Sequence, residues 1–185
     1  DVLYVGHGRW WSLTCADECC PLAGTPLDLT SHPLSASAVL AGLGTRASRH
    51  ELEASVAGPA DDELPRLDRL IDALLVKHEQ LDEPEEAGRL LASMIDQGLV
   101  NPEVLDEESC LLLGLLVRDV HLRDLAWALI APASTDDHVR LWGVVVAHVP
   151  PTVAAAPLCL LGIAAWMQGA GALLNCCSER LARVD

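Results

Sequence analysis

The sequence predicts a mainly α-helical protein: a helical bundle preceded by a short β-hairpin and a cysteine-rich loop. Hydrophobic residues make up 51% of the 185-residue chain but aromatic residues only 3%, so the core must consist mostly of Leu, Val and Ala. Apolar residues recur at helical spacing from position 34 onward. Before that position, two strand-like runs and a turn are followed by cysteines and prolines.

Residues 2–5 and 9–14, joined by a Gly-His-Gly turn, are predicted to form a β-hairpin or two strands of a sheet whose remainder lies upstream. Successive side chains of a strand point to opposite faces, so one of Trp10 and Trp11 can anchor a core while the other is exposed or covered by the cysteine loop. We expect residues 1–33, the hairpin with its Cys- and Pro-rich knuckle, to be the end of an α/β portion that lies upstream.

Residues 34–185 are expected to form the helical domain, with about seven to nine helices in all. Helix starts are marked by residues that can cap free backbone N–H groups: the capping-box pattern at Ser48, then Asp82, and the acidic run from Asp106. A short helix is also expected around residues 39–43.

Residues 152–185 are predicted to form a helical hairpin with a glycine turn, similar in spacing to a tetratricopeptide unit. Trp166 is expected to be buried in it. The uncharged stretch from Leu141 to Ser178 is long enough to suggest a membrane span, but Pro157 and the Pro150-Pro151 pair are expected to interrupt it. We therefore expect two buried helices and no membrane span.

The net charge of −15 is concentrated in residues 51–108, which hold 17 acidic residues against four basic ones. Nucleic-acid binding is not expected, because it depends on Lys and Arg that neutralise phosphates. Solvated helix faces account for the acidic residues more simply than a docking surface for a basic partner. No phosphate-binding glycine loop and no metalloprotease motif occurs.

Three thiols fall within six positions, at Cys15, Cys19 and Cys20. They could bind zinc, with His7 or His32 as the fourth ligand of a tetrahedral site. Only one cysteine cluster is clear, whereas a strong zinc signature has two separated pairs. Buried thiols or a disulfide are therefore the alternative interpretation.

His121 lies between two Arg-Asp pairs, where Asp119 and Asp124 are candidate partners for acid–base chemistry. Ion pairs at a helix end explain the same pattern more simply.

Three groups of residues carry a family resemblance. They are Gly8-Arg9-Trp10-Trp11-Ser12 with Cys15, Cys19-Cys20-Pro21 and Gly24-Thr25-Pro26, then Arg123-Asp124 with Trp127, and Ala155-Ala156-Pro157-Leu158 with Ala164-Ala165-Trp166. With these residues the chain resembles DUF family 4192, an actinobacterial family of unknown function. The resemblance implies the C-terminal part of that family, with an α/β portion upstream, and implies no activity.

These observations favour a cytoplasmic, non-enzymatic protein-interaction or regulatory module that binds a protein partner or self-associates. Trp10 and Trp11 are the candidate interaction residues. The alternative is a zinc-dependent or thiol-based enzyme or sensor with its site at the cysteine knuckle. The cofactor is unknown from the sequence, with zinc as a candidate; Cys20-Pro21 also resembles a haem regulatory dipeptide, but two residues are weak evidence.

Overall fold

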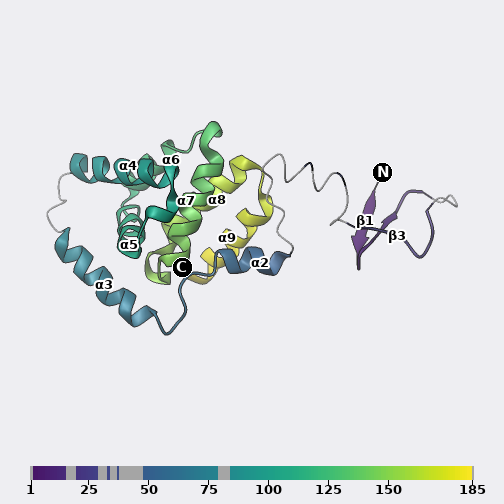
Figure 1. Ribbon diagram of the computed structural model, residues 1–185, viewed down its shortest axis with the longest axis horizontal. Coiled ribbons are helices and arrows are strands. Elements are labelled where there is room, and N and C mark those ends of the chain that lie inside the picture. The colour runs from purple at the N-terminus through teal and green to yellow at the C-terminus, as the bar shows by residue number, and fades with distance from the viewer. Residues whose placement is uncertain are drawn as a thin grey trace. The chain divides into compact units, whose positions relative to one another are not determined.

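The computed structural model describes residues 2–15, 20–28, 33, 37, 48–78 and 84–184. The chain divides into two compact units, residues 1–47 and 48–185. Within the described part, the first unit contains a small antiparallel sheet and the second contains eight α-helices (Figure 1). The mainly helical class predicted from the sequence is confirmed. The predicted helix around residues 39–43 and the predicted cap at Asp82 lie outside the described residues.

The sheet has three strands in the order β1 (Leu3–Gly6), β2 (Arg9–Ser12) and β3 (Thr25–Pro26). The first two form the predicted hairpin. Its turn residues, His7 and Gly8, both have positive φ, at 51° and 70°, as the tightest hairpin turns require. The third strand was not predicted, because two residues give no periodic signal.

The helical unit follows local capping signals. Ser48 accepts a hydrogen bond from the Glu51 N–H at 3.3 Å, as the capping-box pattern predicted, and Asp106 accepts one from the Ser109 N–H at 2.8 Å. Its elements are α2 (Arg49–Ser55), α3 (Leu64–Lys77), α4 (Pro84–Val100), α5 (Glu107–Leu116), α6 (Val120–Ala128), α7 (Thr135–His148), α8 (Pro151–Gln168) and α9 (Gly171–Val184), with short 3₁₀ turns at Pro102–Val104 and Pro132–Ser134.

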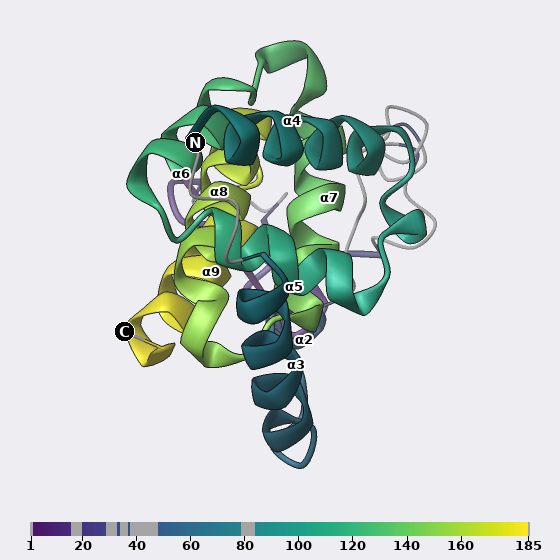
Figure 2. The ribbon, with the colours of Figure 1, turned by 90° about the vertical axis from the view of Figure 1, so that its left-hand side faces the viewer.

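The core lies around α7 and α8. Helix α8 packs against α7 on one side and α9 on another, while α4 and α5 cover α7. Figure 1 shows α7, α8 and α9 next to one another, and Figure 2 shows α4 crossing α7. Trp142, on α7, is the largest side chain that is fully buried in the described residues.

The last two helices form the predicted hairpin. Gly169 takes a left-handed conformation with φ of 85°, and the Ala170 N–H bonds back to the Ala165 carbonyl at 2.8 Å, so α8 ends in a tight turn. A Cβ at Gly162 would lie 3.3 Å from Leu174, so a larger residue there would require the Leu174 side chain to shift. Similarity to a tetratricopeptide unit stays a prediction.

Two expectations for α8 are wrong. Pro157 lies inside the helix and does not end it. Trp166 is 68% exposed, so it is not a core residue of the hairpin. Within the described residues α8 is also the one helix long and apolar enough to cross a membrane, and 50% of this stretch is buried in the helical unit. The absence of a membrane span therefore stays a prediction.

His138 is a fully buried polar side chain of α7. Its Nε2 lies 3.1 Å from the Leu129 carbonyl, which follows the end of α6, so Nε2 carries the proton in the neutral ring. Its Nδ1 has no hydrogen-bond partner among the described residues. Burial lowers the pKa of His138 below its usual 6.5, which keeps the ring neutral in the folded protein.

Replacing Trp142 by Ala should reduce the free energy of unfolding by about 3–5 kcal/mol, because it leaves a cavity in the core of the helical unit. Trp127, on α6, is 53% exposed and gives the matched control. Trp127→Ala should change stability by no more than about 0.5 kcal/mol. Chemical denaturation of both variants checks the difference, and equal losses would contradict the packing described here.

Stability should also fall as the pH drops below 6.5, the pKa of an unperturbed histidine. The unfolded chain binds a proton at His138 more readily than the folded chain, so acid favours unfolding. Hydrogen bonds from Ser109 and Arg66 lower the pKa values of Asp106 and Glu107. The stabilising effect of these two carboxylates is lost only below pH 4.5. Urea titrations between pH 7.5 and 5 measure the histidine contribution.

His138→Gln keeps an N–H donor for the Leu129 carbonyl but does not titrate. The slope of unfolding free energy against pH should become shallower in this variant. His121→Gln, an exposed change on α6, should retain the slope of the parent protein. Parallel slopes in all three proteins would show that His138 is not the titrating group.

Candidate functional site

The cysteine knuckle is fastened to the sheet by polar contacts. The Arg9 guanidinium donates to the carbonyls of Ala23 and Gly24 at 3.0 and 2.7 Å. The Trp11 indole N–H donates to the Leu22 carbonyl at 3.1 Å, and its ring packs 5.4 Å from that of Tyr4. A side chain at residue 24 would collide with that indole, so glycine is required there. Trp11 thus fixes the loop that carries Cys20.

Two of the three candidate thiols come together. Cys15 and Cys20 line the same pocket of about 110 Å³, together with Trp10 and Trp11. Both tryptophans are partly buried and line this pocket. The interaction role predicted for them has no further support in the described residues.

The predicted zinc ligands are only partly placed. Cys19 and His32 lie outside the described residues, and His7 is exposed on the hairpin turn. Where the structure describes the chain, no group of three or more His, Cys, Asp or Glu side chains could hold a metal ion. The zinc site therefore remains a prediction that rests on the pair Cys15 and Cys20.

Two thiols of the helical unit, Cys110 and Cys177, are unsuited to nucleophilic chemistry. Burial raises the pKa of both Cys110 and Cys177 to about 12. These side chains stay protonated at neutral pH, and a protonated thiol is a poor nucleophile. They serve the core as small apolar groups.

His121 does not form a catalytic group with its neighbours. Asp119 caps α6 by accepting hydrogen bonds from the backbone N–H groups of His121 and Leu122, at 2.9 and 3.1 Å. Asp124 pairs with Arg123 at 3.4 Å on the surface. Both carboxylates thus have structural partners, although only Asp124 forms the ion pair that the simpler interpretation predicted and Asp119 is a helix cap instead.

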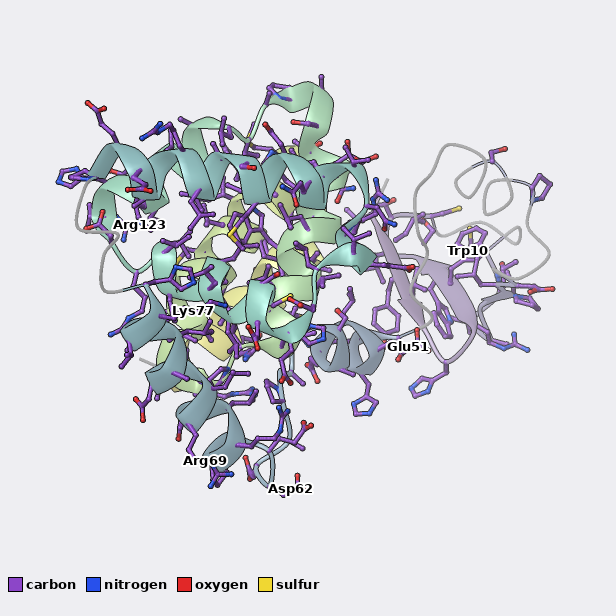
Figure 3. All side chains as sticks on the ribbon, turned by 60° about the vertical axis from the view of Figure 1, so that its left-hand side comes forward. Trp10, Glu51, Asp62, Arg69, Lys77 and Arg123 are labelled. Carbon is purple, nitrogen blue, oxygen red and sulfur yellow. The ribbon has the colours of Figure 1, made fainter. Side chains whose placement is uncertain are left out.

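The acidic middle of the chain is a solvated surface crossed by ion pairs. Arg66 donates hydrogen bonds to Glu107 through its two terminal nitrogens, Nη1 and Nη2. This hydrogen bonding lowers the pKa of Glu107. Lys77 lies 3.7 Å from Glu108. Figure 3 shows Arg69 and Asp62 at the outer end of α3, where both side chains point into solvent.

An apolar groove of about 460 Å³ lies between α8 and α9. Its walls include Leu158 and Ile163 from α8, and Leu174 and Leu181 from α9. Trp166 also lines the groove and keeps most of its indole exposed. This pairing of a hollow with a protruding aromatic ring was not expected from the sequence, which placed Trp166 in the core.

Arg180 is the polar residue that sequence reasoning missed. Only 7% of it is exposed, and its Nη1 donates to the carbonyls of Val146, at 3.1 Å, and of Val56. The signal was the Pro150-Pro151 pair. Neither proline has an N–H, so the carbonyls of Val146 and Ala147 lose their usual helical donors. A side-chain donor is then needed at the end of α7.

No curated protein and no solved structure matches the chain in sequence or structure comparison. A family model does match, and it extends over residues 1–185, which include the knuckle as well as every helix described above. The resemblance carried by the Trp and Cys residues is thereby confirmed, and the chain belongs to the family described as "Domain of unknown function (DUF4192)".

Proposed function

We propose that this protein is a non-enzymatic protein-interaction module, and that it self-associates through the groove between α8 and α9. The observation that carries the proposal is the exposed indole of Trp166 beside an apolar hollow on the same surface. Tryptophan is enriched among the residues that dominate binding energy at interfaces. Large exposed apolar side chains next to a groove are typical of contact surfaces.

A second copy of the chain fits this surface because hollow and protrusion lie side by side. In a two-fold symmetric dimer the same patch contacts itself, so each patch must supply both parts. Trp166 of one copy would enter the groove of the other, and the reverse contact would follow from the symmetry. A partner without a protruding apolar group would leave the groove unfilled.

The distribution of charge also favours self-association at this face. Helices α8 and α9 together carry one Glu and two Arg, whereas residues 51–108 hold 17 acidic residues against four basic ones. Two copies that met through the acidic part would repel each other. The α8–α9 face brings two copies together without that repulsion.

Trp166→Ala should convert the dimer to a monomer in sedimentation velocity, because it removes the aromatic anchor from both halves of the interface. For the parent protein we expect a dissociation constant of about 10 μM or tighter. The monomer of the variant should keep its helical circular dichroism, since the indole is largely exposed.

Trp127→Ala is the matched control, because Trp127 is also an exposed tryptophan but does not line the groove. It should leave the dimer intact. A parent protein that stays monomeric at about 100 μM, or a Trp166→Ala variant that still dimerises, would overturn self-association through this face.

We infer a second candidate function, a zinc- or thiol-based site at the knuckle, because Cys15 and Cys20 line one pocket. Thiolates are preferred zinc ligands, and two of them from a short loop supply half of a tetrahedral set. Cys19 with His7 or His32 would complete it, in agreement with the sequence pattern.

Native mass spectrometry with elemental analysis tests this second candidate. The reduced protein should carry one zinc per chain, and Cys15→Ser or Cys20→Ser should lose it. Cys159→Ser, on α8, is the matched control and should retain the metal. A reduced protein that takes up no zinc from a stoichiometric supply would exclude the metal site.

A further inference from the structure

A second pocket, of about 550 Å³, lies on another side of α9, between that helix and α2. Its volume falls in the range of about 300–1,000 Å³ that is usual for small-molecule sites. Most of its wall is apolar, with Ala54 and Val56 from the first helical segment and Val184 from the last helix. Arg180 and Arg183 are the two arginines that line it.

Arg180 is a buried cation, and only part of its guanidinium group is hydrogen-bonded. Its Nη1 is used by the carbonyls of Val56 and Val146, while Nε and Nη2 make no hydrogen bond within the described residues. Among the described residues, His138 Nδ1 and Trp142 Nε1 are the fully buried side-chain polar atoms that have no hydrogen-bond partner. Nε and Nη2 of Arg180 are therefore not fully buried, and Arg180 is among the residues that line the pocket.

No carboxylate among the described residues forms an ion pair with Arg180. The two acidic residues that line the pocket, Glu53 and Glu179, are both bound by Arg49, at 2.8 and 2.6 Å. Arg183 lines the pocket without an ion pair in the described part of the chain. The three arginines thus exceed the two glutamates by one positive charge, on a chain whose net charge is −15.

The ends of two helices help to stabilise the positive charge of Arg180. The carbonyls that bind Nη1 belong to the ends of α2 and α7, where the helix dipole is negative. They engage one nitrogen only. Nε and Nη2 form the other side of the planar guanidinium, and this pair of donors matches the two oxygens of a carboxylate.

We propose that this pocket binds a monocarboxylate with an apolar body, and that the carboxylate is held by Nε and Nη2 of Arg180. A single excess positive charge matches one carboxylate better than a doubly charged phosphate. The apolar walls match an aliphatic group. Two sources offer this chemistry: a free aliphatic acid, or the C-terminal carboxylate of a peptide that ends in an apolar residue.

Isothermal titration calorimetry of the full chain with sodium hexanoate is the first experiment. Binding at one site per chain is expected, with a dissociation constant of about 1 mM or tighter. Hexanamide, which has the same shape without the charge, should bind at least about tenfold more weakly. An N-acetylated tripeptide ending in leucine, compared with its C-terminal amide, distinguishes the peptide source from the free acid.

Variants locate the site. Arg180→Met should abolish hexanoate binding, but it also removes the donor for the Val146 carbonyl and can unfold the protein. Ala54→Leu fills the pocket from α2 without touching Arg180, and should weaken binding by at least about tenfold. Ala73→Leu, an exposed change on α3 away from this pocket, is the matched control and should bind like the parent protein.

The proposal is overturned if neither hexanoate nor the tripeptide binds, if hexanamide binds as tightly as hexanoate, or if Ala54→Leu leaves binding unchanged. It does not depend on self-association, because the dimer groove uses Leu174 and Leu181 of α9 and the pocket uses Arg180 and Arg183. Sedimentation of Ala54→Leu should still show the dimer of the parent protein.

Discussion

The carbonyl groups at the end of α7 need hydrogen-bond donors, because Pro150 has no N–H to offer Val146. Arg180 meets this need from α9 and also bonds the Val56 carbonyl after α2. One side chain therefore connects the end of α7, the end of α2 and the last helix. Arg180 lies on α9, which packs closely against α8 at Gly162.

Local signals predicted much of the fold. The β-hairpin follows from alternation and a glycine turn, and the helix starts at Ser48 and Asp106 follow from side chains that cap their own backbone. The exposure of Trp166 was not predictable in this way. Helix α8 is apolar on nearly all sides, so its sequence does not indicate which face meets the core. Packing against α7 and α9 decides that, and leaves Trp166 outside.

The cysteine knuckle and the Arg180 site also differ in how far local sequence could predict them. Cys15 and Cys20 are close in sequence, so their proximity in one pocket could be anticipated. Arg180 could not be chosen from the several arginines of the chain, because its two carbonyl partners lie 34 and 124 residues away. The proline pair indicates that a donor is missing at the end of α7. It does not indicate which helix supplies it.

The span between Val56 and Arg180 has a consequence for how the helical unit folds. Most contacts between neighbouring helices close short loops, but this one closes a loop of 124 residues, with a correspondingly larger loss of chain entropy. Contacts that close long loops must offset this entropy, so local contacts between helices are favoured to form first. Weakening the hydrogen bond between Arg180 and the Val56 carbonyl should then accelerate unfolding while the folding rate stays nearly constant. Arg180 would thus affect the lifetime of the folded state more than the rate of folding.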